Sequence, residues 1–178
     1  MAVRTNTVLA ASEEERAIRD AVRGIVAQYG PDYYQQQVDD GGNCAELWNE
    51  LGDNGYLGVH LPEEYGGGGL GLGELNIVVH EAAVAGCPMQ SMLFSSGVTG
   101  TVLERSASTD QKARWLPGVA SGRTRLSFAI TEPDSGSNAH RISTTAHRDG
   151  DRYVLNGQKV FITGMESARW VMVVARTG

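Results

Sequence analysis

Apolar side chains recur every three or four positions through most of residues 1–124, which is the spacing of one buried face of an α-helix. The first such run follows Ser12, whose hydroxyl can accept from the amide of Glu15 while that carboxylate reaches back in a capping box. This helix is expected to end near Tyr29, before Gly30-Pro31. Further helices are predicted over residues 45–51, 74–85 and 89–103, and over 111–115 behind a cap at Thr109. We therefore expect an all-helical unit.

The period of the apolar pattern changes to two after Arg125, as the two faces of a β-strand require. Asp149-Gly150 and Asn156-Gly157 tolerate the positive φ angles of tight hairpins and predict turns. The pattern predicts successive antiparallel strands over residues 126–130, 142–146, 152–155, 158–163 and 170–175. The last strand leaves an unpaired apolar edge, which we expect the rest of a longer protein or a second polypeptide to cover. We place a domain boundary between residues 124 and 125.

The chain of 178 residues is 41% hydrophobic, enough for a sizeable core, and has a net charge of −6 with only 15 Lys plus Arg. This charge gives no basic field for a nucleic-acid backbone, so we expect no nucleic-acid partner. No apolar run approaches the roughly 20 residues that cross a bilayer, and no secretory signal is evident, so we expect a cytoplasmic protein without a membrane partner. Cys44 and Cys87 have no CxxC companion and are expected to be reduced structural thiols.

Polar groups suited to a phosphate-bearing cofactor gather after the first predicted strand. Thr131, Ser135 and Ser137 offer hydroxyls, and Gly136 lets the backbone approach a large anion closely. A second predicted strand ends in Phe161-Ile162-Thr163-Gly164. Together they indicate a flavin site, because a flavin needs donors where negative charge develops on reduction, and amides and hydroxyls supply them. Taken alone, each segment also fits a structural role, the first as a polar loop and the second as an apolar strand.

Several other motifs are interpreted as structural. His80-Glu81 begins like a zinc-protease helix, but Val84 stands where the second histidine is needed, and the sequence indicates no metal site. The glycine run 66–69 lacks the Lys-Ser/Thr ending of a phosphate-binding loop, so we interpret it as a flexible surface turn. Glu132 has no His or second carboxylate at a diagnostic spacing and is assigned a structural role. We interpret three histidines as surface or satisfied polar residues: His60, His140 and His147.

Four segments, in the same order as in that family, resemble the acyl-CoA dehydrogenases: residues 57–67, 111–117, 131–138 and 159–164. The likeness covers nearly all of the chain from about Glu13 onward. It implies an α+β fold with an all-helical N-terminal domain over 1–124, followed over 125–178 by the start of an antiparallel β-barrel-like middle domain. The likeness ends before the family's C-terminal helical bundle. Three positions depart from the family's common residues, Asn138 replacing Asp, Phe161 replacing Trp and Gly164 replacing Asn.

The resemblance also implies which residues bind FAD. The Ile130 and Thr131 amides and the Thr131 hydroxyl are expected at the pyrimidine edge of the ring. Phe161 is expected to pack on the ring, with the Thr163 hydroxyl bound to flavin N5. Ser137, beside the pyrophosphate, is also the implied acyl-CoA-binding residue. The full set of implied cofactor-binding residues is Phe128, Ala129, Ile130, Thr131, Gly136, Ser137, Phe161, Ile162 and Thr163.

The activity implied by the resemblance is FAD-dependent α,β-dehydrogenation of an acyl-CoA thioester, in fatty acid metabolism. A carboxylate removes the α-proton while the β-hydrogen leaves as hydride to the flavin. Electrons would pass to an electron-transfer flavoprotein, and the enzyme would be a homo-oligomer. The family's base is a glutamate of the C-terminal helical region, beyond Gly178, so no catalytic residue is nominated and the chain alone is expected to be inactive. Two alternatives stay open: an acyl-CoA oxidase or flavin monooxygenase on the same scaffold, and a non-catalytic subunit that completes a heteromeric partner.

Overall fold

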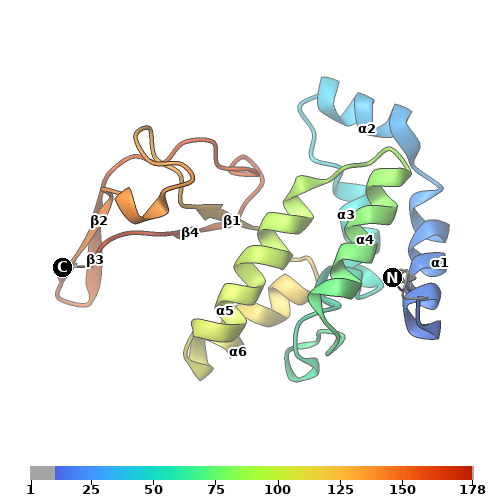
Figure 1. Ribbon diagram of the computed structural model, residues 1–178, viewed down its shortest axis with the longest axis horizontal. Helices are drawn as coiled ribbons and strands as arrows, with labels where there is room; N and C mark the ends of the chain where they lie inside the picture. Colours follow the sequence, from blue (N-terminus) through green and yellow to red (C-terminus); the bar gives the residue numbers. More distant parts are fainter. Residues whose placement is uncertain (1–10, 178) are drawn as a thin grey trace, which may run out of the picture.

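The computed structural model describes residues 11–177, in which a helical part lies beside a strand-bearing part (Figure 1). The longer helices are α1 (Glu13–Val26), α2 (Gly30–Asp39), α3 (Ala45–Asp53), α4 (Leu72–Val84), a π-helix (Met92–Gly100), α5 (Thr101–Ser106) and α6 (Thr109–Ala120). Short 3-10 helices cover Tyr56–Gly58, Glu63–Tyr65 and Ala139–Arg141. The strands are β1 (Leu126–Ala129), β2 (Thr145–Asp149), β3 (Arg152–Asn156) and β4 (Trp170–Val173). The expected fold class, a helical N-terminal domain followed by strands, is confirmed, and the described strands form two two-stranded sheets rather than a closed barrel.

The first predicted helix is confirmed at its start and differs at its end. Glu15 N donates to Ser12 Oγ at 3.0 Å, and Ser12 N donates to the Glu15 carboxylate at 2.6 Å, which completes the capping box. The helix stops at Val26, short of Tyr29, and α2 begins at Gly30, whose φ is 84°. Gly30-Pro31 thus starts a helix as well as ending one, because proline lacks an N–H that the first turn would leave without a partner.

The cap of α6 lies one residue earlier than predicted. Ser108 Oγ accepts from Gln111 N at 3.3 Å, and the Gln111 side chain accepts from Ser108 N at 2.9 Å. Thr109 is therefore the first helical residue and not the cap. A Ser-x-x-Gln capping box explains the difference, because it satisfies two amides where a lone Thr109 hydroxyl satisfies one.

The expected single helix over 89–103 is divided into the π-helix and α5. Two serine side chains of the π-helix form hydrogen bonds with backbone groups outside the helix, at a place where the helical turn is wider than in an α-helix. Ser96 Oγ donates to the Leu57 carbonyl, and Ser95 Oγ accepts from Leu126 N at 2.9 Å. The π-helix is therefore the element that ties the helical part to the start of β1.

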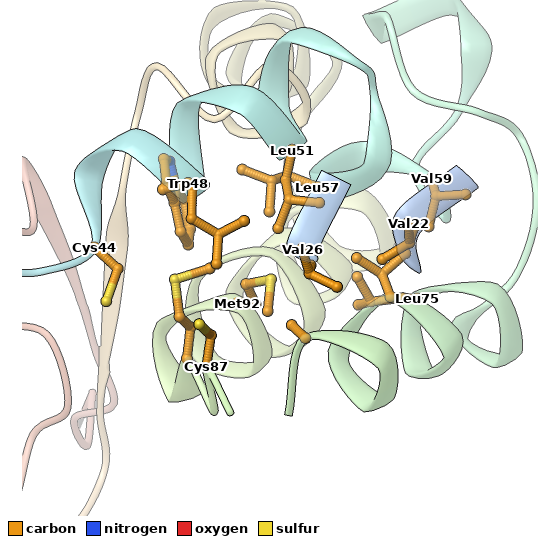
Figure 2. Packing of buried hydrophobic residues seen from close by; sticks show 14 residues of the cluster. Val22, Val26, Cys44, Trp48, Leu51, Leu57, Val59, Leu75, Cys87 and Met92 are labelled. Carbon is orange, nitrogen blue, oxygen red and sulfur yellow. The ribbon is translucent and has the colours of Figure 1, made fainter. Parts of the chain in front are cut away.

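The core of the helical part contains Trp48 of α3, which lies on the same side of the cluster as Cys44 and Cys87 (Figure 2). Both thiols are free and buried, as predicted. Trp48 Nε1 donates to the Gly122 carbonyl at 2.7 Å, and the Arg125 guanidinium lies 4.4 Å from the centre of the Trp48 ring. These contacts fix the chain just before β1 against the helical core.

The glycine run is not the flexible turn that its composition predicts. Backbone amides along the run bind carbonyls of the preceding segment: Gly67 to Pro62 at 3.1 Å, Gly68 to Gly58 at 3.0 Å, Gly69 to Leu61 at 2.8 Å and Leu70 to Val59 at 3.0 Å. Glycine is needed at position 67 because an added Cβ would lie 2.1 Å from the Leu61 carbonyl oxygen. Close backbone approach, rather than mobility, explains the glycines here.

The strands are only partly the antiparallel series that the pattern predicts. β2 and β3 are antiparallel across the Asp149-Gly150 turn, and β2 begins at Thr145 rather than Ile142. β1 and β4 are parallel, with Leu126 opposite Trp170. The expected hairpin at Asn156-Gly157 does not form. β3 ends at Asn156, and Gly157 lies against Thr144, where an added Cβ would be 2.3 Å from Oγ1.

Residues 158–163, expected to be a strand, form no strand in the structure. Phe161 has a φ of 56°, which interrupts an extended backbone and is costly for a residue with a Cβ. The segment between β3 and β4 therefore crosses beside the end of β1 and returns the chain in the direction of β1. This crossing explains why β4 pairs in parallel with β1.

Candidate functional site

The two segments of the predicted site lie side by side at the end of β1. Val160 N donates to the Thr131 carbonyl at 3.0 Å, and Ser127 Oγ donates to the Thr163 carbonyl at 2.9 Å. Lys159 Nζ donates to the Ile130 carbonyl at 2.9 Å. Backbone and side-chain bonds thus join residues more than 25 apart in sequence and place Thr131 and Thr163 on adjoining stretches of chain.

The predicted site residues differ in exposure. Ala129 is buried, which fits a residue of β1 that faces the core. Phe161 is 92% exposed and so presents its aromatic ring to solvent. Five residues are partly buried, namely Phe128, Ile130, Thr131, Ile162 and Thr163, and two are exposed, namely Gly136 and Ser137. The site is therefore an open wall rather than an enclosed cavity.

The loop after β1 is fixed by its own hydrogen bonds. Glu132 N donates to the Ser135 carbonyl at 2.9 Å, and Ser135 N donates back to Glu132 at 3.1 Å. Ser135 Oγ donates to the Asn138 carbonyl at 2.8 Å. Ser135 is thus committed within the loop, which leaves the exposed Ser137 and the unobstructed Gly136 to meet a ligand.

Glu132 is a buried structural carboxylate, in line with the role that the sequence suggests. It accepts from Ser143 N at 2.6 Å, Ser143 Oγ at 2.8 Å, Thr144 N at 2.8 Å and Lys159 Nζ at 2.9 Å. Hydrogen bonds from Thr144, from Ser143 and from Lys159 hold the pKa of Glu132 well below its ordinary value, although burial raises it. A carboxylate so engaged is a poor proton acceptor, which argues against a role as general base.

Lys159 is the residue of this site that sequence reasoning missed. It stands in the run 159–164 that carries the resemblance, yet its role there was not foreseen from the pattern. Its side chain is 10% exposed and reaches both the Ile130 carbonyl and Glu132. A lone lysine within an apolar strand-like run was the available signal, because a buried ammonium needs a charged or carbonyl partner.

One pocket adjoins the predicted site residues, and a second lies within the helical part. One, of about 190 Å³, has Thr163 and Gly164 on one side and the Met89, Gln90 and Ser91 stretch on the other. A second, apolar groove of about 290 Å³ runs between α4 and the π-helix, lined by Leu72, Leu75, Asn76, Val79, Leu93, Gly97 and Val98. Both are bordered by the segment that leads into and forms the π-helix.

The described residues carry neither a metal-binding cluster nor a membrane-spanning helix. No group of three or more His, Cys, Asp or Glu side chains between residues 11 and 177 is arranged to hold a metal ion. Over the same range, no helix has the length and apolar character to span a membrane.

His60 is half-buried, with Nε2 3.1 Å from the Ser96 carbonyl. Its Nδ1 is buried without a partner in the described structure, so only one of its two ring nitrogens is satisfied.

Known proteins resemble the chain in sequence and structure. The family model for the acyl-CoA dehydrogenase N-terminal domain matches residues 12–123, and that for the middle domain matches residues 127–178. The acyl-CoA dehydrogenase FadE12 of Mycobacterium tuberculosis is 49% identical over 97% of this chain and 45% of its own length. The mitochondrial isovaleryl-CoA dehydrogenase of Bos taurus is 32% identical over 93% of this chain and 40% of its own. The chain thus spans about half the length of these relatives.

Solved structures agree with the sequence relatives. A glutaryl-CoA dehydrogenase from Mycobacterium smegmatis in complex with FADH2 superimposes with a TM-score of 0.86 at 30% identity, over 97% of this chain and 45% of that one. A chain from a structure described as an electron transferring flavoprotein of Acidaminococcus fermentans superimposes with a TM-score of 0.88 at 27% identity. The match covers 96% of this chain and 45% of that one. With both domain families matched along nearly all of its described length, the chain belongs to the acyl-CoA dehydrogenase family.

Proposed function

We propose that the chain is the N-terminal and part of the middle domain of an FAD-dependent acyl-CoA dehydrogenase. The observation that carries the proposal is the junction of β1 with residues 159–164, held by Ser127, Lys159 and Val160. It brings an exposed aromatic ring, two threonines and a strand end together. FADH2 in a glutaryl-CoA dehydrogenase relative supports a flavin as the ligand of this wall.

The residues present suit an isoalloxazine ring. The chain ends β1 at Ala129, so the amides of Ile130 and Thr131 lie outside the named strands and β-ladders. We assign to them, and to the Thr131 hydroxyl, the hydrogen bonds to the pyrimidine edge. The exposed Phe161 ring offers a flat apolar face, and Thr163 offers a hydroxyl beside it. Bound FAD would supply the hydride acceptor for the acyl β-hydrogen.

The acyl-CoA is assigned to the side of the wall that faces the helices. Thr163 borders the pocket that also contains Gln90 and Ser91, and the apolar groove between α4 and the π-helix continues along the same helical segment. An acyl chain needs such an apolar surface, and the exposed Ser137 can meet the polar CoA. The catalytic base is assigned to a part of the enzyme outside this chain, since Glu132 is engaged by four hydrogen bonds.

An electron-transfer flavoprotein as electron acceptor, a homo-oligomeric state and a cytoplasmic location stay predictions of the same proposal. The oxidase, monooxygenase and non-catalytic alternatives also stay open. Stopped-flow reoxidation of the reduced full-length protein separates the first two from a dehydrogenase. A dehydrogenase is expected to reoxidise faster with a carrier flavoprotein than with air, and an oxidase the reverse.

Replacing Thr163 by Val is expected to weaken FAD binding about tenfold, because one hydrogen bond to the ring is lost while the shape is kept. The measurement is a titration of the purified full-length protein with FAD, followed by the visible absorption of the bound flavin. Thr145→Val in β2, which makes the same change away from the wall, is expected to bind like the parent. A parent protein that binds no flavin, or a Thr163→Val protein that binds it equally well, would contradict the proposal.

The isolated 178-residue chain is expected to bind FAD weakly and to dehydrogenate nothing. The wall is open on the side that Phe161 faces, so the ring would stay in contact with solvent. Coexpression with the remaining domains of the enzyme is expected to restore both binding and turnover. Tight stoichiometric FAD on the isolated chain, seen in its absorption spectrum, would show that the described residues suffice.

A further inference from the structure

Lys159 and Glu132 form a buried ion pair at the point where the two segments of the wall meet. The Lys159 side chain is 10% exposed and that of Glu132 is 3% exposed. The ammonium lies 2.9 Å from the Glu132 carboxylate and 2.9 Å from the Ile130 carbonyl. Glu132 in turn holds the backbone at Ser143 and Thr144. One pair thus connects three stretches of chain.

Phe161 follows two residues after this lysine in a conformation that L-residues rarely adopt. Its φ of 56° is unfavourable for a residue with a Cβ, and its ring gains little from packing because it is 92% exposed. A left-handed residue of this kind persists only if its neighbours are held. Lys159 and Val160 are bound on one side, and the Thr163 carbonyl accepts from Ser127 on the other.

Stability alone does not explain an ion pair at this place. Two charges taken out of water cost more free energy than apolar side chains of the same volume, and their replacement is often neutral or stabilising. The Lys159 ammonium, however, donates to two acceptors on different residues, so its side chain is held at two points. The pair therefore supplies a defined position for the 158–164 segment, which apolar packing would specify less closely.

We propose that Lys159 and Glu132 are a positioning pair that holds Phe161 in its left-handed conformation and Thr163 beside β1, and thereby sets the wall that receives the flavin ring. Both residues act through the backbone of the 158–164 segment and not on the flavin directly. The inference rests on the proposed FAD site for its functional half. Its structural half, the fixing of residues 158–164, stands without any ligand.

Hydrogen exchange of the full-length protein tests the structural half. Lys159→Met and Glu132→Gln are each expected to speed exchange of the amides in 158–164 about tenfold, while amides of α3 and α4 keep their protection. Amide exchange in 158–164 of the double variant is expected to be no faster than in the faster-exchanging single variant, because the two residues act as one unit. Lys112→Met is the matched control, since the Lys112 side chain makes no ion pair or hydrogen bond among residues 11–177, and Lys112 is the chain's other lysine.

A titration with FAD tests the functional half. The dissociation constant is expected to rise about tenfold in Lys159→Met and to stay unchanged in Lys112→Met. Should Lys159→Met fail to fold, Glu132→Gln carries the test, because it removes the charge that Lys159 binds while it keeps the shape of the side chain. The same local exchange and the same loss of affinity are then expected.

Three results would overturn the positioning role. They are unchanged exchange in 158–164, faster exchange throughout the helical part, and faster local exchange with unaltered FAD affinity. A parent protein that binds no FAD would instead remove the proposed function. Exchange in that protein would still decide whether the pair fixes the segment.

Discussion

Replacing both Arg19 and Arg23 by Met is expected to lower the free energy of unfolding by about 3–5 kcal/mol. Arg19 and Arg23 of α1 both bind Glu81 of α4, whose side chain is only 1% exposed, and the Arg23 Nε to Glu81 Oε2 distance is 2.7 Å. Removing both guanidinium groups leaves a buried carboxylate with only the half-exposed His80 beside it, at 3.1 Å. An uncompensated buried charge is among the most costly defects in a fold.

The pH dependence of stability is expected to change sign in the same variant. In the parent, burial raises the pKa of Glu81. Hydrogen bonds from Arg23, His80 and Arg19 lower the same pKa by a larger amount, so it lies below the ordinary value. The ion pairs then contribute fully to the free energy of unfolding above about pH 4.3. This contribution is lost as the pH falls through the lowered pKa of Glu81. Without the arginines, burial prevails and the pKa lies above the ordinary value. The variant is therefore expected to become more stable as the pH falls toward 4, where Glu81 is protonated.

Urea unfolding at pH 7 and at pH 5 measures both effects. Arg123→Met with Arg141→Met is the matched control, since both side chains are exposed and make no hydrogen bond within the described part of the chain. Adding Glu81→Leu to the Arg19 and Arg23 variant is expected to recover most of the loss, because it removes the stranded charge. Equal losses in the control pair, or no recovery with Glu81→Leu, would mean that the carboxylate is not the cause.

The helices are predictable from the sequence because their signals are local. The capping box at Ser12 and Glu15 lies within four residues, and the apolar spacing of α1 and α4 repeats within each helix. The start of α2 could not be seen in the same way, because Gly30-Pro31 is a signal both for ending and for beginning a helix. Local patterns determine that a helix exists better than where it ends.

The strand part is harder to predict because its partners are distant in sequence. Residues 158–163 alternate like a strand, yet the bonds from Lys159 and Val160 to residues 130–132 and the left-handed Phe161 prevent one. The parallel pairing of β1 with β4 follows from that crossing and has no local signature. The adjacency of the two site segments was nevertheless expected, because the resemblance carries long-range information that periodicity lacks. The binding roles of the site residues stay predictions.

Composition alone gives the wrong prediction for the glycine run 66–69. Gly67→Ala is expected to destabilise the protein by about 3 kcal/mol, from steric overlap and from the hydrogen bonds that the backbone must give up to relieve it. The new Cβ would lie 2.1 Å from the Leu61 carbonyl oxygen and 2.8 Å from that of Gly58. Both neighbours are backbone atoms, so no side-chain rotation can make room.

Gly73→Ala, six residues further on, supplies the contrast that identifies the cause. Gly73 lies in the first turn of α4 with nothing within 4 Å of an added Cβ, so alanine is expected to stabilise the protein by about 0.5 kcal/mol through its higher helix propensity. Thermal unfolding of the two variants is therefore expected to move in opposite directions from the parent, with Gly67→Ala lower by roughly 6–12 °C. A flexible turn would tolerate alanine at position 67 as readily as at 73. Equal midpoints for the two variants would thus restore the interpretation that composition suggests and reject the close backbone approach.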